Sequence, residues 1–160
     1  MEISLFEPRI PQNTGNIART CAAFDISLNL IEPLGFKLED KYLKRAGLDY
    51  WPLVKINKYL NFEEFLESKQ NKRIISFSKK NGIHLNNYKF MSEDILLFGR
   101  EDNGLPESIL KKSHSIVSIY MPNLETQNKD KKGVRSLNLS VACGIAIYEA
   151  HKQINLGNSN

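Results

Sequence analysis

The chain has few cysteines and histidines, and this scarcity excludes several classes of protein. Two cysteines without a Cys-x-x-Cys pair cannot build a disulfide framework, so a reducing cytoplasm is the expected compartment. Three scattered histidines show no metal-ligand spacing, and we expect no metal site. The longest stretch without Asp, Glu, Lys or Arg, residues 136–148, is too short for a membrane span of about 20 apolar residues. Glu2 and Glu7 also stand where a secretory signal is basic and then apolar.

The remaining composition is typical of one folded domain. The chain has 160 residues, of which 41% are hydrophobic, and this predicts a single domain over residues 1–160 with a frayed tail from about residue 156. Lys and Arg outnumber Asp and Glu by 22 to 18. The resulting net charge of +4 is only a mild bias toward polyanions.

Short apolar runs alternate with helix-like segments along the chain. Five runs predict strands: residues 3–6, 27–31, 73–77, 94–98 and 115–120. Helical spacing is found in four segments: residues 14–24, 62–66, the stretch after Pro106, and residues 136–154. Asn13 or Thr14 is the expected N-cap of the first helix. The alternation predicts an α/β domain with a mostly parallel sheet and flanking helices.

The first sequence motif, Pro-Gln-Asn-Thr-Gly-Asn-Ile-Ala-Arg-Thr at residues 11–20, joins the first predicted strand to the first helix. Ligands of open α/β sheets bind outside the carboxyl ends of the strands, so this loop is well placed for a site. Asn16 and Arg19 are three residues apart and lie on neighbouring faces of one helical turn. Arg19 could hold a phosphate through its planar guanidinium, but an ordinary capped helix with exposed polar residues fits the spacing equally well.

The second motif, Phe-Gly-Arg-Glu-Asp-Asn-Gly-Leu-Pro at residues 98–106, directly follows the fourth predicted strand. Its glycines have the spacing of a phosphate-binding loop, but Leu105 and Pro106 stand where Lys and Ser or Thr are required, which excludes that loop. No Gly-x-Gly-x-x-Gly opens the first crossover, so the dinucleotide fingerprint is also missing. The two glycines around Glu101 would let the backbone approach a flat ligand beside an acid. A simple Asp-Asn-Gly turn is the alternative.

The third motif consists of Met121 and Pro122, a polar loop at residues 123–134, and Arg-Ser-Leu-Asn-Leu-Ser at residues 135–140. The polar loop has almost no apolar side chains and is predicted to be mobile, either as a solvated insertion or as a basic loop that meets phosphates. Ser136 is the expected N-cap of the final helix, with Asn138 in its first turn. Free backbone N–H groups there can bind a ligand, or the residues can serve capping alone.

In this order and combination, the motifs resemble the SPOUT class of S-adenosylmethionine-dependent RNA methyltransferases. The similarity is greatest to the small TrmL (YibK) type, which methylates the ribose 2′-oxygen of the tRNA wobble nucleotide. The stretch Arg-Ala-Gly-Leu-Asp-Tyr at residues 45–50 is particular to that group, and the resemblance extends over residues 3–152. The chain departs from the family at Gly99-Arg100-Glu101, where Gly-Pro-Glu is common, and in its longer polar loop.

The resemblance implies a fold with a deep trefoil knot near the carboxyl end, in which S-adenosylmethionine binds without a metal. Carried over by motif, the cofactor contacts fall on four residues and involve mostly backbone atoms: Phe77, Gly99, Met121 and Ser136.

The resemblance also implies which side chains serve the reaction. Arg19 matches the arginine that engages the phosphate and the hydroxyl of the target nucleotide. Because arginine stays protonated, we expect it to orient and activate rather than to act as a base. Three residues are expected to fix the loops and the ribose, with Ser140 as a weaker candidate: Asn16, Glu101 and Asn138.

The implied partners are a second copy of the chain and the anticodon stem-loop of tRNA, which a cytoplasmic homodimer would read with its own surface. The dimer would form through the knot region and the final helix. Candidate phosphate contacts are Arg9, Lys79, Lys80, Lys129, Lys131 and Lys132. Two rival functions stay open, which are 2′-O-methylation at another tRNA site or in rRNA, and non-catalytic RNA binding. The presence of Asn16, Arg19, Glu101 and Asn138 argues against the second, because binding alone does not need this constellation.

Overall fold

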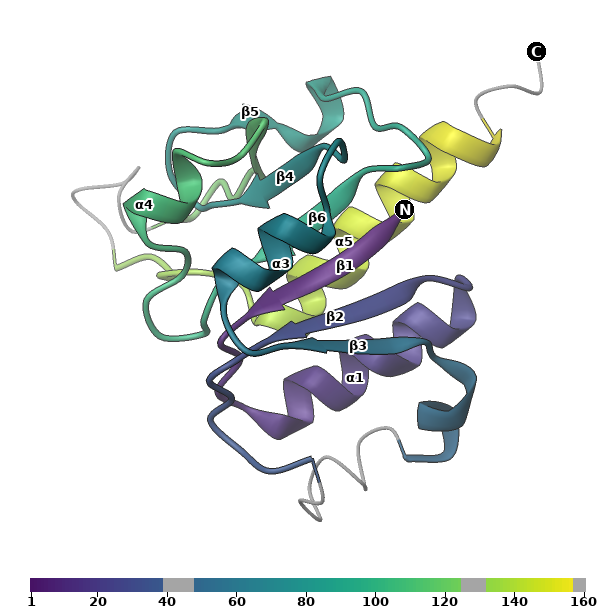
Figure 1. Cartoon of the computed structure of the whole chain (residues 1–160). Helices are drawn as coiled ribbons and strands as arrows, with labels where there is room; N and C mark the ends of the chain where they lie inside the picture. Colours follow the sequence, from purple (N-terminus) through teal and green to yellow (C-terminus); the bar gives the residue numbers. More distant parts are fainter. Residues whose placement is uncertain (39–47, 125–131, 157–160) are drawn as a thin grey trace.

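The computed structural model describes residues 1–38, 48–124 and 132–156. Its centre is a sheet of seven parallel strands in the order β3-β2-β1-β6-β4-β7-β5 (Figure 1). The strands are β1 (Glu2–Phe6), β2 (Ser27–Ile31), β3 (Ile56–Tyr59), β4 (Ile74–Phe77), β5 (Ile83–His84), β6 (Ile95–Phe98) and β7 (Ser115–Ser118). The α-helices are α1 (Pro11–Ala23), α3 (Phe62–Ser68), α4 (Glu107–Leu110) and α5 (Leu139–His151). Three short helical segments complete the described part: η1 (Leu48–Leu53), η2 (Leu85–Asn87) and η3 (Lys152–Leu156).

The predicted α/β class with a parallel sheet is confirmed, and each of the five predicted strands is present with small changes at its ends. The sequence prediction missed β3 and β5, which are the two edge strands. β3 carries Asn57 and Lys58 in its four residues, and β5 has only two residues, so neither shows the apolar run of a strand buried on both faces.

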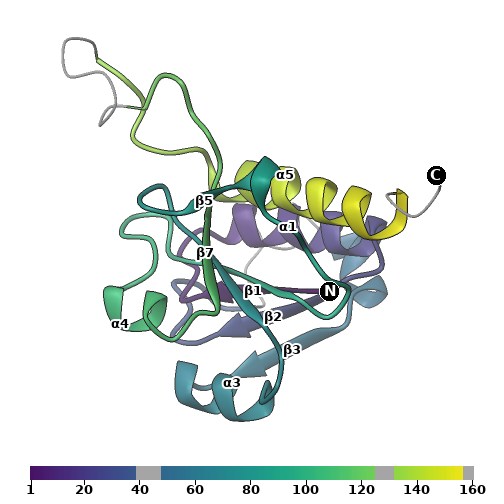
Figure 2. The ribbon, with the colours of Figure 1, turned by 90° about the horizontal axis from the view of Figure 1, so that it is seen from above.

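Helices cover both faces of the sheet (Figure 2). On one face, α1 and α5 pack on each other and on alternate strand residues such as Ile3, Leu5 and Leu28. On the other face, α3 and α4 cover the intervening strand residues, including Ile31 and Leu97. β6 is buried along its whole length, which explains its continuous apolar run.

The two long helices begin at residues other than those expected. α1 starts at Pro11, and its N-cap residue Ile10 offers no side-chain acceptor, so the prediction of Asn13 or Thr14 as the cap is wrong. α5 starts at Leu139, with Asn138 as the N-cap whose side chain accepts from the Ser140 N–H, so Ser136 is not the cap. Asn13 and Thr14 lie about one turn inside α1, and Ser136 lies two residues before the N-cap of α5. Proline at the first helical position fits α1, because that N–H has no partner within a helix.

The strand order places one topological switch beside β1. The chain runs outward from β1 through β2 to β3, whereas β6 lies on the other side of β1. The arrowheads of β1, β2 and β4 lie at one edge of the sheet in Figure 1. The loops that follow β1 and β6 therefore leave the same edge next to each other, and a ligand site is expected there in an open α/β sheet.

Ionic side chains cluster around Glu2, which is the first residue of β1 and lies at the opposite ends of the strands from the ligand site expected above. Its carboxylate accepts hydrogen bonds from Lys69 Nζ at 2.6 Å, Lys72 Nζ at 2.8 Å and Asn29 Nδ2 at 2.8 Å. Burial alone would raise the pKa of Glu2, but these hydrogen bonds outweigh burial and lower the pKa to about 2. This cluster joins β1 and β2 to the segment that follows α3.

None of the helices in the described part of the chain has the length and apolar character needed to cross a bilayer. Across residues 1–38, 48–124 and 132–156, no three or more His, Cys, Asp or Glu side chains are grouped so that they could hold a metal ion.

Candidate active site

The loop after β6 is a tight turn that presents Glu101 to the loop after β1. Arg100 and Gly104 exchange backbone hydrogen bonds of 3.2 and 2.9 Å, and Gly104 has a φ of +70°. A Cβ on Gly99 would lie 2.2 Å from the carbonyl carbon of Gly104, so only glycine fits there. The Asp-Asn-Gly turn is thus present, and the acid between the two glycines is held at the sheet edge.

Glu101 binds the start of α1 with both carboxylate oxygens. Oε2 accepts from the Arg9 N–H at 2.8 Å, and Oε1 accepts from the Ile10 N–H at 3.2 Å and from Asn13 Nδ2 at 3.1 Å. The N–H of the N-cap residue Ile10 has no acceptor within the helix, so Glu101 satisfies it, and the negative charge interacts favourably with the helix dipole. Glu101 therefore acts as the cap of α1 from another part of the chain, with three donors on its carboxylate.

Asn13 connects this acid to the start of α5. Its side chain is 5% exposed, and its Oδ1 accepts from Asn138 Nδ2 at 3.0 Å. Asn138 Oδ1 accepts in turn from the Ser140 N–H at 2.8 Å and the Ser140 hydroxyl at 2.7 Å. The predicted site residues Glu101, Asn138 and Ser140 are thus joined in one hydrogen-bond chain, and Asn13 is the link that sequence reasoning treated only as a cap.

Arg19 and Asn16 lie farther along α1 and are exposed. No hydrogen bond within the described residues joins either side chain to the Glu101 chain. Asn16 instead accepts, through its backbone carbonyl, from the Thr20 hydroxyl at 3.0 Å. The Arg19 guanidinium carbon lies 4.7 Å from the centre of the Tyr50 ring in η1.

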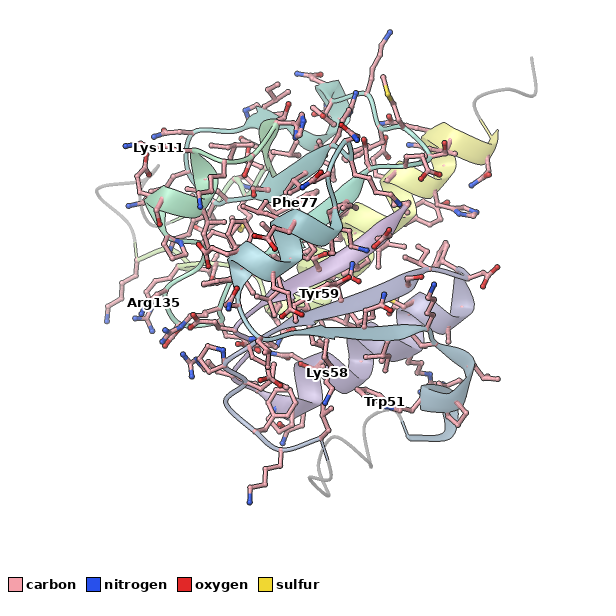
Figure 3. All side chains as sticks on the ribbon, in the orientation of Figure 1. Trp51, Lys58, Tyr59, Phe77, Lys111 and Arg135 are labelled. Atoms are coloured by element: carbon pink, nitrogen blue, oxygen red, sulfur yellow. The ribbon has the colours of Figure 1, made fainter. Side chains whose placement is uncertain are left out.

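The predicted cofactor residues follow three neighbouring strands. Phe77 ends β4, Gly99 follows β6, and Met121 lies shortly after β7, and these strands are adjacent in the order β6-β4-β7. Phe77, labelled in Figure 3, stacks on the buried Phe98 with ring centres 4.5 Å apart and an interplanar angle of 14°, and the half-buried Phe77 ring presents an apolar surface at the sheet edge. Ser136 is exposed and precedes α5.

The polar loop closes at its base. Leu124 and Val134 pair in parallel, and the Val134 N–H donates to the Asn123 carbonyl at 2.9 Å. Leu124 is buried, and residues 125–131, on which most of the predicted mobile loop falls, lie outside the described residues. Arg135 lies at this same edge in Figure 3.

An ionic cluster that the sequence prediction missed lies beside the Glu101 turn. Arg100 contacts Asp102 at 2.6 Å and Glu7 at 3.4 Å, and Glu7 also contacts Arg9 at 2.9 Å. The Arg100 N–H donates to the Gly104 carbonyl, a bond that a proline at residue 100 could not make. Arg100 therefore ties the loop after β6 to the loop after β1 a second time.

The predicted RNA-contacting residues divide into three groups. Lys79, Lys80 and Lys132 are exposed, whereas the Arg9 guanidinium is held by Glu7. Lys129 and Lys131 lie outside the described residues. Their roles stay predictions.

The cysteines and the cavities do not add chemistry to this site. Burial raises the pKa of Cys21 to about 12 and raises that of Cys143 well above its ordinary value, so both thiols stay protonated and cannot serve as nucleophiles. Cavities of about 330 Å³ and 380 Å³ are lined by other residues, including Tyr120 in the first and Lys58 in the second.

Comparison with known proteins gives matches over nearly the whole chain. The model of the SpoU rRNA Methylase family matches residues 1–148. A protein of Aeromonas hydrophila named tRNA (cytidine(34)-2′-O)-methyltransferase is 38% identical over 159 residues, which cover 99% of this chain and 97% of the relative. A solved structure described as "Structural insights into the 2-OH methylation of C/U34 on tRNA" is 45% identical, with a TM-score of 0.86 and coverage of 95% of this chain and 94% of that one. An AdoMet-bound rRNA methyltransferase from Sinorhizobium meliloti shares the fold at 22% identity, with a TM-score of 0.82 and coverage of 94% and 55%.

Proposed function

The chain belongs to the SpoU rRNA methylase family, and we propose from this that it is an enzyme that transfers a methyl group from S-adenosylmethionine to the ribose 2′-oxygen of tRNA nucleotide 34, a cytidine or a modified uridine. The observation that carries the proposal is the full-length similarity to the solved structure concerned with this reaction, at 45% identity. The SPOUT fold class that the motifs predicted agrees with that structure.

The residues at the sheet edge fit S-adenosylmethionine. The half-buried Phe77, stacked on the buried Phe98, offers an apolar surface for an adenine ring. Phe77, Gly99, Met121 and Ser136 would hold the cofactor, mostly through backbone groups beyond the strand ends. When bound, the sulfonium supplies a reactive methyl group, so that no metal is needed for the transfer.

Arg19 would orient the target nucleotide. Its guanidinium presents planar N–H donors that match a phosphate or a ribose oxygen. Glu101 is occupied by three hydrogen bonds, so we assign it the placement of loops rather than removal of the hydroxyl proton. A phosphate of the RNA is the acceptor that we propose for that proton. Positioning then accounts for much of the rate.

A second copy of the chain is the partner that we propose for α5. Val141, Ile145 and Tyr148 lie on one face of this helix and are 50%, 39% and 60% exposed. Gly144, on the same helix, has open space where a Cβ would be. An apolar face of this kind is typical of a protein interface. The active enzyme would be a cytoplasmic homodimer, and the trefoil knot near its carboxyl end likewise stays a prediction from the resemblance.

The anticodon stem-loop of tRNA is the proposed substrate surface, and Arg9, Lys79, Lys80, Lys129, Lys131 and Lys132 are the proposed phosphate contacts. Mapping of 2′-O-methylated nucleotides in RNA from cells with and without the protein tests this assignment. Loss of the mark at nucleotide 34 of particular tRNAs is the expected result. Loss at another tRNA site or in rRNA would support the first rival function, and an unchanged map would support non-catalytic binding.

A further inference from the structure

Tyr50 is the one aromatic residue whose ring faces the Arg19 guanidinium within the described residues, at 4.7 Å from ring centre to guanidinium carbon. Arg19 is exposed, and none of the ion pairs in the described part of the chain includes it. An exposed arginine without such a contact samples many rotamers, and fixing it costs conformational entropy. The Tyr50 ring reduces that cost before RNA arrives.

We propose that Tyr50 is a positioning residue for methyl transfer, which holds the Arg19 guanidinium ready for the ribose and phosphate of the target nucleotide. The proposal rests on the proposed function, because only that function assigns Arg19 to binding the target nucleotide. Tyr50 itself has no contact with substrate or cofactor in this account.

An aromatic ring is better suited to this task than a carboxylate. A carboxylate would bind the N–H donors of Arg19 and neutralise its charge. The ring attracts the cation through its face and leaves the donors at the guanidinium edge free. Arg19 therefore keeps both its full charge and its hydrogen-bonding capacity for the RNA.

The segment that carries Tyr50 is held in place by packing. η1 packs against α1, the helix that carries Arg19. The next residue, Trp51, is partly buried against the core to which α1 and α5 contribute, and Pro52 restricts the backbone of the segment. The ring and the guanidinium are thus attached to two elements that are held against each other.

Single-turnover methylation of tRNA at saturating S-adenosylmethionine tests the proposal. Tyr50→Leu is expected to slow methylation by about two- to fivefold, the range that a partly exposed cation–π contact supports. Tyr50→Phe keeps the ring and is expected to match the wild-type rate, and cofactor affinity is expected to stay unchanged in both. Leu53→Ala, at a 69% exposed position of the same helical segment, is the matched control with an unchanged rate.

A double-mutant cycle separates positioning from support of the fold. In an Arg19→Ala background, Tyr50→Leu is expected to cause no further loss, because the group that it positions is gone. Pentafluorophenylalanine at residue 50 keeps the shape of the ring while reversing its face charge, and it is expected to slow methylation as Tyr50→Leu does. Equal loss in Tyr50→Leu and Tyr50→Phe, a full Tyr50→Leu effect without Arg19, or a wild-type rate with the fluorinated ring would each overturn the proposal. A wild-type protein that methylates no RNA would instead reject the proposed function.

Discussion

A single residue, Glu101, joins three segments of the chain. Its carboxylate binds two backbone N–H groups and the Asn13 amide, and through Asn13 it reaches Asn138. A carboxylate is the side chain that can accept all three donors at once. The acid that lies among the candidate catalytic residues is therefore explained by loop placement.

Glu101→Gln tests this explanation. The amide NH₂ group would face N–H donors and leave one of them unpaired, so we expect the free energy of unfolding to fall by about 1–3 kcal/mol. Urea unfolding measures the change. Glu67→Gln, at an exposed acid of α3, is the control and is expected to change stability by less than about 0.5 kcal/mol. Equal stability of the two variants would contradict the capping role of Glu101.

Arg19→Ala is expected to slow methyl transfer by about 10²–10³, the usual loss when a charge-stabilising donor is removed from a closed site. Cofactor affinity is expected to stay near that of the wild type, because Arg19 lies on α1 and the proposed cofactor residues follow β4, β6 and β7. Arg19→Lys should restore only part of the rate, since a point charge lacks the planar fork. Single-turnover methylation and cofactor titration, read together, measure both effects.

Ser136→Trp is the contrast to Arg19→Ala. A large side chain beside the proposed cofactor position should remove both cofactor binding and activity. If Arg19→Ala instead weakened cofactor binding as much as it slowed methylation, Arg19 would belong to the cofactor site and the assignment would be wrong.

At the scale of the element, the exposed apolar face of α5 predicts a dimer. Ile145→Glu would place a charge in the proposed interface and is expected to yield monomers at micromolar concentration, as measured by light scattering. Leu60→Glu is the control, because Leu60 is 73% exposed in the connection between β3 and α3. A wild-type protein that is monomeric and fully active would rule out the dimer as the functional form.

Elements were predictable from the sequence where they are buried on both faces. β6 is a continuous apolar run, and the apolar stretches of β1 and β2 are interrupted only at Ser4 and Asn29, which is typical of central parallel strands. The edge strands β3 and β5 lack this pattern and were missed. Helix ends were also misplaced, since α1 takes its cap from Glu101, which is about 90 residues away and invisible to local spacing.

The candidate site was likewise predictable from the sequence only in part. Glu101 and Asn138 are recognisable from their motifs, but their connection through Asn13 depends on contacts between residues separated by 88 and 125 positions. Tyr50 belongs to a recognised motif, yet its ring-to-guanidinium contact requires η1 to pack on α1. Long-range pairing of this kind is set by the fold and cannot be read from spacing.

At the scale of the whole molecule, the Glu2 cluster predicts how stability depends on pH. The folded state holds the pKa of Glu2 at about 2, below its ordinary value of 4.5. The lowered pKa means that the unfolded chain binds the proton more tightly than the folded chain. The stabilisation that ionised Glu2 gives the folded state is therefore complete above about pH 4.5 and is lost as the pH falls toward 2. In urea unfolding from pH 6 to pH 2.5, the free energy of unfolding is expected to fall less for Glu2→Gln than for the wild type. Identical pH profiles of the two proteins would contradict the assignment.

Methyl transfer to a defined tRNA tests the central claim most directly. Purified protein is incubated with S-adenosylmethionine carrying a labelled methyl group and with two tRNAs that differ only in ribose or 2′-deoxyribose at nucleotide 34. Label is expected in the tRNA with ribose and none in its 2′-deoxy counterpart. Equal labelling of the two tRNAs, or no labelling of either, would contradict it.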